Sequence, residues 1–302
     1  MPRKSVKLVV VVVAAAAAAM AAYLYLLRSG GEEPTPPQPR KVVVLCGESM
    51  RPAMEDILRR YRRLFPDRVV VQYGRSGELC AQLEQTRAGD IFVCHDPFAA
   101  WASQAGLIDA WATVAYLDVV IVVPKGNPKD IKDLTDLARP GLRVGISPRI
   151  YATSNDIARA VTYSTAGQMV EHMLAGLKQR EAILKNVRRE APGQRQRCQE
   201  VVTGDLDAAI VWNAVADEFR DRLEVVPIGE QHKRRLDAVT SATTKGINLR
   251  EVKVTVCLTR RAEGAPAARR FYDFVVRRCK DIFAAHGFRT EGPSSGPTKQ
   301  AG

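Results

Sequence analysis

Residues 42–79 read VVVLCGESMRPAMEDILRRYRRLFPDRVVVQYGRSGEL, and this stretch decides the fold. Short apolar runs alternate here with helical segments, which are expected from about Pro52 to Leu64 and from Glu78 onward. The apolar runs are VVVL at 42–45, VVVQY at 69–73 and, beyond the second helix, DIFVC at 90–94. Buried strands that alternate with helices predict an α/β fold with a mostly parallel sheet that is covered on both faces.

The same alternation is repeated further along the chain. An apolar strand over Val119–Val123 precedes a second series of expected elements: LRVGI at 142–146, helices from about Asn155 and Gln168, AAIVW at 208–212 and LEVVPI at 223–228. A last strand over Lys253–Thr259 leads into a helix expected over Ala265–Ala285, where Phe271 and Phe274 lie at helical spacing. This helix is expected to return to the first unit.

The pattern therefore predicts two α/β lobes, each a mostly parallel sheet flanked by helices, joined by two crossing strands. Lobe 1 is expected over 41–122 and 251–290, and lobe 2 over 123–250. Ligands of open α/β sheets bind beyond the carboxyl ends of the strands, so a binding cleft is expected between the lobes.

The first 28 residues predict an export signal or a membrane anchor. The basic segment MPRKSVK is followed by twenty uncharged residues from Leu8 to Leu27 and then by Arg28. Twenty helical residues just span a bilayer, and the basic flank places the following chain outside the cytoplasm, in the periplasm. The alanine run leaves room for a cleavage site, so both a cleaved signal and an inner-membrane anchor over residues 8–27 stay open. Four prolines in residues 29–40 predict an extended linker, and 291–302 are expected to form a flexible tail.

The charge and the cysteines narrow the function classes. The chain carries a net charge of +12, of which +9 belongs to residues 41–302. No zinc-finger spacing, dimerising heptad or aromatic RNA-binding motif accompanies this charge, so no nucleic-acid partner is expected. The six cysteines form no CxxC pair and no metal-ligand spacing, and both disulfides and buried thiols remain possible.

Two turns between a strand and a helix carry the candidate chemistry. Ser49 follows the first strand, Ser76 follows the second, and each is expected to cap the helix that begins there. The start of a helix presents free backbone N–H groups and a partial positive charge, which together bind anions. Because parallel strands end at the same edge of a sheet, both turns are expected to face one anion.

From about Val42 to Gly287 the chain resembles the periplasmic molybdate-binding proteins of ABC importers, which have the type II periplasmic-binding-protein fold. The segments that carry the resemblance are CGESMRPAMEDI, YGRSGEL, GDIFVCHDPFAAWASQAGLID, VVIVVPKGNP, GDLDAAIVWNAVA and AARRFYDFVVRRCKDIFAAHGF. The resemblance implies a protein without catalytic activity or cofactor. Such a protein captures molybdate or tungstate in the cleft and delivers it to the permease and ATPase of an ABC importer.

In that family, serine hydroxyls, backbone N–H groups and a tyrosine hydroxyl hold the oxyanion. Matched by segment, the resemblance implies first-lobe contacts at Ser49 and Ser76 and second-lobe contacts at Thr153 and Gln194. The family tyrosine falls on Trp212, whose indole N–H can donate a hydrogen bond but cannot accept one.

Charged residues near these turns depart from the family pattern. Glu48 stands where the family has a small residue, and a carboxylate that faced a dianion would repel it. Arg75 precedes Ser76 and Arg51 follows Met50, so a charge-assisted site with Arg75 as a ligand contact is also expected.

Other functions remain open at this point. Sulfate, phosphate or a ferric complex would suit the same fold, with Tyr73, Tyr151, His95 and Asp96 as conceivable metal ligands. An enzyme would need Cys46 or Cys94 as nucleophile and His95 as base. Adjacent residues of one strand point to opposite faces, which excludes the pair Cys94 and His95. A membrane-tethered module that serves a separate sensor chain is the remaining alternative.

Overall fold

The computed structural model describes residues 41–149, 164–236 and 248–292, together with Met20. The expected anchor over 8–27, the linker, Thr153 and the tail from residue 293 lie outside the described residues. The chain divides into two compact units, 1–40 and 41–302. Of the first unit the structure describes Met20, an exposed helical residue. Within the described part of the chain, no helix is long and apolar enough to cross a bilayer.

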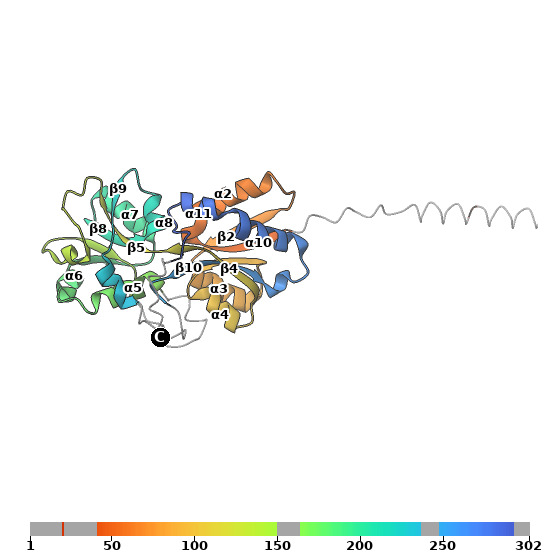
Figure 1. The fold of residues 1–302 in the computed structure, drawn as a ribbon, viewed down its shortest axis with the longest axis horizontal. Helices are drawn as coiled ribbons and strands as arrows, with labels where there is room; N and C mark the ends of the chain where they lie inside the picture. The colour runs from red at the N-terminus through yellow and green to blue at the C-terminus, as the bar shows by residue number, and fades with distance from the viewer. Residues whose placement is uncertain (1–19, 21–40, 150–163, 237–247, 293–302) are drawn as a thin grey trace, which may run out of the picture. The chain divides into compact units, whose positions relative to one another are not determined.

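The first lobe is a five-stranded sheet covered by helices (Figure 1). Its strands are β1 (Val42–Gly47), β2 (Val69–Gly74), β3 (Ile91–His95), β4 (Ile108–Leu117) and β10 (Val252–Thr259). Its helices are η1 (Glu48–Met50), α2 (Arg51–Arg62), α3 (Ser76–Thr86), α4 (Phe98–Gln104), η5 (Arg260–Ala262), α10 (Pro266–Arg278) and α11 (Lys280–Ala285). The strand order is β2-β1-β3-β10-β4, and β10 runs antiparallel to both of its neighbours.

The second lobe repeats this plan. Its strands are β5 (Val119–Pro124), β6 (Val144–Ile146), β7 (Val187–Glu190), β8 (Ala208–Trp212) and β9 (Leu223–Val226). Its helices are η2 (Leu134–Ala138), α5 (Thr165–Leu174), α6 (Arg180–Asn186), α7 (Gln194–Thr203), α8 (Asn213–Asp217), α9 (Glu230–Lys233) and η4 (Arg234–Leu236). The order is β7-β6-β8-β5-β9, with β5 antiparallel to β8 and β9.

The predicted two-lobed α/β class is confirmed, and each sheet is mixed because it contains one opposed strand. Strand β4 was not predicted, since its side chains alternate between buried and exposed rather than forming a continuous apolar run. The single helix expected over 265–285 is wrong: Cys279 separates α10 from α11. The backbone of Cys279 is not helical there, at φ −123° and ψ 11°.

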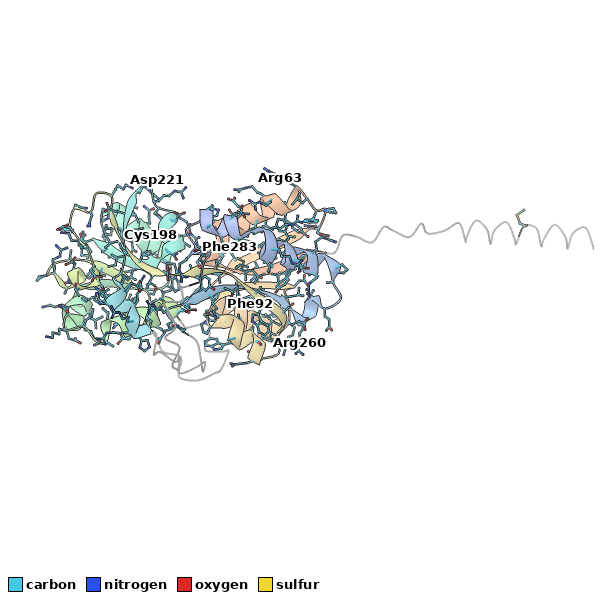
Figure 2. All side chains as sticks on the ribbon, viewed as in Figure 1. Arg63, Phe92, Cys198, Asp221, Arg260 and Phe283 are labelled. Carbon is cyan, nitrogen blue, oxygen red and sulfur yellow. The ribbon has the colours of Figure 1, made fainter. Side chains whose placement is uncertain are left out.

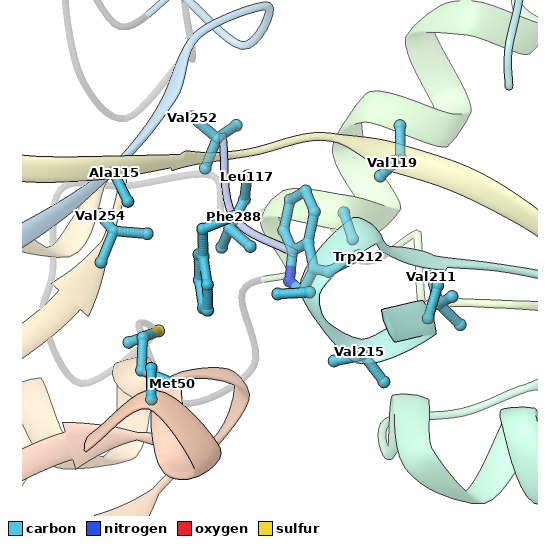
Figure 3. Close-up of a cluster of buried hydrophobic side chains, with 14 of the residues drawn as sticks. Met50, Ala115, Leu117, Val119, Val211, Trp212, Val215, Val252, Val254 and Phe288 are labelled. Atoms are coloured by element: carbon cyan, nitrogen blue, oxygen red, sulfur yellow. The ribbon is translucent and has the colours of Figure 1, made fainter. Parts of the chain in front are cut away.

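Each lobe has a packed interior, and one apolar cluster continues from the first lobe into the second. Phe92 and Phe283 are fully buried in lobe 1 and Cys198 in lobe 2, whereas Arg63 and Asp221 project from the surface (Figure 2). Figure 3 shows the shared cluster where the lobes join. Its members there include Met50, Leu117, Val119, Trp212 and Phe288.

The chain passes from the first sheet to the second through a single residue, Asp118, between β4 and β5. Asn213 fixes this crossing: its Oδ1 accepts the Asp118 N–H at 3.0 Å, and its own N–H donates to the Asp118 carbonyl at 2.8 Å. The Asn213 Nδ2 donates to the Gly287 carbonyl at 2.7 Å, and Arg289 pairs with the Asp118 carboxylate at 3.1 Å. One amide side chain therefore links the crossing to the C-terminal segment.

Replacing Asn213 by alanine should lower the free energy of unfolding by about 1–3 kcal/mol, because the Asp118 N–H and the Gly287 carbonyl would both lose their partner. Urea denaturation followed by circular dichroism measures the change. Gln199→Ala, at an exposed position of α7, is the control and should stay within about 0.5 kcal/mol of wild type. Equal stabilities for the two variants would contradict this account of the crossing.

Candidate functional site: an anion-binding cavity between the lobes

A cavity of about 280 Å³ lies between the lobes. First-turn residues of several helices line it, and four of these turns present polar side chains. These turns are called the four helix starts: Ser49 in η1, which continues into α2, Ser76 in α3, Thr165 in α5 and Gln194 in α7. Two starts come from each lobe. Of the predicted site residues, Ser49, Arg75, Ser76, Gln194 and Trp212 all line this cavity, and Thr153 lies outside the described residues.

The prediction that Ser49 and Ser76 cap their helices is wrong. Each serine lies inside the first helical turn, and the residues at the cap positions, Gly47 and Arg75, make no side-chain capping bond. The two turns approach closely because Gly47 has no side chain: a Cβ there would lie 2.6 Å from the Ser76 Oγ. Freed from capping, both hydroxyls remain available to a ligand.

Neither hydroxyl has a strong partner within the described chain. The Ser49 Oγ lies 3.1 Å from the Met50 thioether sulfur, a weak acceptor. Ser76 is 5% exposed, and its side chain makes no hydrogen bond with the described residues. A ligand that accepts hydrogen bonds from these two hydroxyls would therefore not have to replace a strong hydrogen bond within the protein.

The third helix start, that of α5, is tied to both lobes. The Ser164 Oγ caps α5 by accepting the Gly167 N–H at 3.1 Å. The Thr165 hydroxyl donates across the cleft to the Asp96 carbonyl of lobe 1, at 2.8 Å. Gly167 is required because a Cβ there would lie 1.8 Å from the Pro148 carbonyl oxygen.

At the fourth start, the Gln194 side chain has a structural contact. Its Oε1 accepts the Trp212 backbone N–H at 2.6 Å, which ties α7 to the end of β8. Gly193 occupies the cap position with φ 91°, in the left-handed region that favours glycine. Trp212 is 3% exposed, and its ring centroid lies 5.7 Å from that of His95 across the cleft. The Trp212 ring is therefore both a core residue and a wall of the cavity.

The Glu48 carboxylate is neutralised at the cavity rim. It forms two hydrogen bonds with Arg51, at 2.9 and 3.0 Å, and one with Arg195 of lobe 2, at 3.1 Å. Arg195 also donates to the Glu48 carbonyl and pairs with Glu218 at 2.6 Å. Arg195 is thus an ionic bridge between the lobes, and it removes the repulsion expected between Glu48 and a bound anion.

Arg75 also lines the cavity, with its side chain 39% exposed. Its described ion pair is with Glu78, one helical turn along, at an Nη1 to Oε1 distance of 3.3 Å. Such an exposed pair contributes little free energy, so the guanidinium can turn toward a ligand at small cost.

His95 is neutral in this site. Burial lowers its pKa to about 4, and its Nδ1 lies 2.8 Å from the Asp96 carbonyl oxygen. Because a carbonyl oxygen accepts only, Nδ1 carries the proton. Burial also raises the pKa of the Cys46 and Cys94 thiols, which are fully buried and absent from the cavity lining, so neither suits a nucleophile.

Four second-lobe residues at the cavity escaped sequence reasoning: Ser147, Ser164, Thr165 and Arg195. Ser164 follows no recognisable strand, but Ser147 follows the predicted strand 142–146, as Ser49 and Ser76 follow theirs. This shared position, directly after a predicted strand, is the sequence signal that could have identified Ser147. Arg195 lies in the polar run GQRQRCQE, where no sequence pattern separates a rim residue from a solvated one.

Known proteins share this architecture. The molybdate-binding protein ModA of Mycobacterium tuberculosis is 34% identical over 108 residues, which cover 35% of this chain and 41% of that relative. The sulfate-binding protein SubI of the same organism has a TM-score of 0.62 at 17% identity, covering 84% of this chain and 88% of SubI. Iron-bound HitA of Pseudomonas aeruginosa has a TM-score of 0.59 at 14% identity, covering 87% and 90%.

The family assignment rests on a longer match. The model of the family described as bacterial extracellular solute-binding protein matches residues 42–289, which include every described strand and helix of both lobes. The chain therefore belongs to the bacterial extracellular solute-binding protein family.

Proposed function

We propose that this chain works outside the cytoplasm, where it captures a tetrahedral oxyanion, molybdate or tungstate, in the cavity between its lobes. It then delivers the anion to an ABC importer, which consists of a permease and an ATPase. One observation carries the proposal: four helix starts, two from each lobe, converge on one cavity. Each start contributes backbone N–H groups and the positive end of a helix dipole.

The chemistry of the described lining suits a ligand that only accepts hydrogen bonds. Ser49 and Ser76 offer hydroxyls without strong partners, and Arg75 adds a cation at the rim. The one carboxylate of the described lining, Glu48, is held by Arg51 and Arg195. A tetrahedral dianion with four acceptor oxygens matches this set of donors.

A ferric ligand fits the described lining less well. Hard metal ions are held by clusters of oxygen and nitrogen ligands. Among the described residues, no group of three or more His, Cys, Asp and Glu side chains is placed to hold a metal ion. His95 and Glu48 are the metal-ligating types in the described lining, and Glu48 is already paired. The partial similarity to a molybdate-binding relative favours molybdate or tungstate among the oxyanions.

Calorimetric titration of the full-length protein with molybdate, tungstate, sulfate and phosphate should give heat with molybdate or tungstate. At a ligand concentration of 100 times Kd, the bound anion should stabilise the fold by about 2.7 kcal/mol, measured as a shift of the unfolding transition. Binding of sulfate or phosphate alone would overturn the choice of ligand but not the site. No binding of any of the four would overturn both.

Ser49→Ala and Ser76→Ala should each weaken anion binding by about 1 kcal/mol, the net value of one hydrogen bond, while the unfolding midpoint stays at its wild-type value because neither serine caps a helix. Ser49→Asp and Ser76→Asp should abolish binding, since a carboxylate would face the dianion, and should leave the fold intact.

Ser164→Ala is the matched control for these serines. Ser164 does cap α5, so its loss should lower the free energy of unfolding by about 1 kcal/mol. Near-native affinity in the two Asp variants would show that these turns do not bind the ligand.

Arg75→Ala should weaken binding by about 1.5–3 kcal/mol, the range for a charge-assisted hydrogen bond. Glu78→Gln is the complementary variant, because it releases Arg75 from its pair and should tighten binding. Calorimetry on both variants measures the two effects. Unchanged affinity in Arg75→Ala would assign this side chain to the solvated surface.

A further inference from the structure

An arginine without an acidic partner is buried behind the cavity. Arg197, on α7, is 1% exposed, and it forms no ion pair with any described residue. Its Nη2 donates to the Ser147 Oγ at 2.8 Å, its Nη1 donates to the Ala191 carbonyl, and its Nε has no partner among the described residues. Burial lowers its pKa to about 10, so the guanidinium stays protonated at neutral pH.

The Arg197 side chain has space because of a glycine. A Cβ at Gly145 of β6 would lie 3.0 Å from the Arg197 Cδ and 2.7 Å from a Leu206 methyl carbon. The guanidinium therefore reaches Ser147, which is 3% exposed and lines the cavity where β6 ends. It also reaches Ala191, which directly precedes the cavity-lining residues Pro192 and Gly193.

The hydrogen bond from Arg197 determines how Ser147 can act. A guanidinium donates but cannot accept, so the Ser147 O–H cannot point at Arg197. Its oxygen accepts this bond, and its hydrogen has no acceptor among the described residues, so the hydrogen is free to point into the cavity that Ser147 lines. Ser147 thereby keeps its hydroxyl hydrogen available as a donor to a ligand in the cavity.

Burial of an unpaired guanidinium is unfavourable unless a countercharge is near. Within the described chain the Glu200 carboxylate attracts Arg197 but forms no ion pair with it, and pairs instead with Arg189 at 3.0 Å. The cavity is the adjacent space that an anion can enter. An anion bound next to Ser147 would compensate the charge of Arg197 through one intervening hydroxyl. Two charges separated by a single hydroxyl group interact more strongly in a low-dielectric interior than they would in water.

We propose that Arg197 is a positioning and specificity-determining residue of this site, which orients the Ser147 hydroxyl as a donor to the bound oxyanion and makes the site prefer dianions to monoanions of the same shape. The inference rests on the oxyanion function proposed above, and it assigns the charge preference to one buried side chain.

The test compares tungstate with perrhenate, a tetrahedral dianion and a tetrahedral monoanion, by calorimetry on the full-length protein. Arg197→Met should lose at least about tenfold in tungstate affinity and clearly less in perrhenate affinity. Its ligand-free unfolding midpoint should equal or exceed that of wild type, because the substitution removes an unpaired buried charge. Arg188→Met, at an exposed position of β7, is the control and should change neither quantity.

The role of Ser147 is tested by a double-mutant cycle. Ser147→Ala should lose about tenfold in tungstate affinity, and the double variant should bind almost as Arg197→Met does, because the arginine acts through the serine hydroxyl. Should Arg197→Met fail to fold, Arg197→Gln takes its place, since it keeps an N–H donor without the charge. The same fall in the ratio of tungstate to perrhenate affinity is expected.

The outcomes separate the two proposals. Wild-type protein that binds neither anion overturns the oxyanion function itself. Wild-type protein that binds tungstate, with an unchanged affinity ratio in the arginine variants, overturns the role of Arg197 alone. Equal losses for both anions together with a lower unfolding midpoint would assign Arg197 a purely structural role.

Discussion

The passage of the chain through Asp118 is the constraint on which both lobes depend. Strand β4 of the first sheet ends immediately before Asp118, and strand β5 of the second sheet begins immediately after it. Asn213 forms hydrogen bonds with the N–H and carbonyl groups of Asp118 and with the Gly287 carbonyl of the C-terminal segment. Around it one hydrophobic cluster continues from the first lobe into the second, and both Trp212 and Phe288 belong to it (Figure 3). The lobes are therefore continuous on one side of the cleft and meet through polar contacts at the cavity.

The polar contacts across the cleft are of two kinds. Thr165 donates to a backbone carbonyl of lobe 1, and Arg195 joins Glu48 of lobe 1 to Glu218 of its own lobe. Neither requires a ligand, so the lobes have some affinity for each other beforehand. On the function proposed above, an anion in the cavity would accept hydrogen bonds from both lobes and so add to this existing contact. If the lobes close on a bound anion, these direct contacts would contribute to closure together with the anion.

Much of the fold followed from periodicity, because buried strands of parallel sheets are continuous apolar runs. Strand β8 coincides with the predicted AAIVW, and β1, β2, β3 and β10 lie within a residue or two of their predicted bounds. Strand β4 was missed since one of its faces is exposed. The strand-end serines were found by position, but the predicted capping role was wrong because a helix start can shift by one or two residues without a change in local composition.

Arg197 could not have been found in this way. It occurs in a run of polar residues that is typical of a solvated helix, and only the missing side chain of Gly145, some fifty positions earlier, makes its burial possible. Side chains whose role depends on a distant glycine carry no local signal. Glu48 was misjudged for a similar reason. The sequence predicted that its carboxylate would repel a dianion, but Arg51 and Arg195 neutralise this carboxylate in the structure.

The burial of all six cysteines as free thiols has a consequence for biogenesis. The thiolate is the form that oxidants and disulfide exchange attack, and burial raises the pKa of five of these thiols, those of Cys46, Cys80, Cys94, Cys198 and Cys279. The folded chain is thus protected from oxidation, whereas an unfolded chain in an oxidising compartment would expose six reactive sulfurs. In such a compartment the integrity of the chain would depend on burial of these thiols in the fold rather than on disulfide bonds.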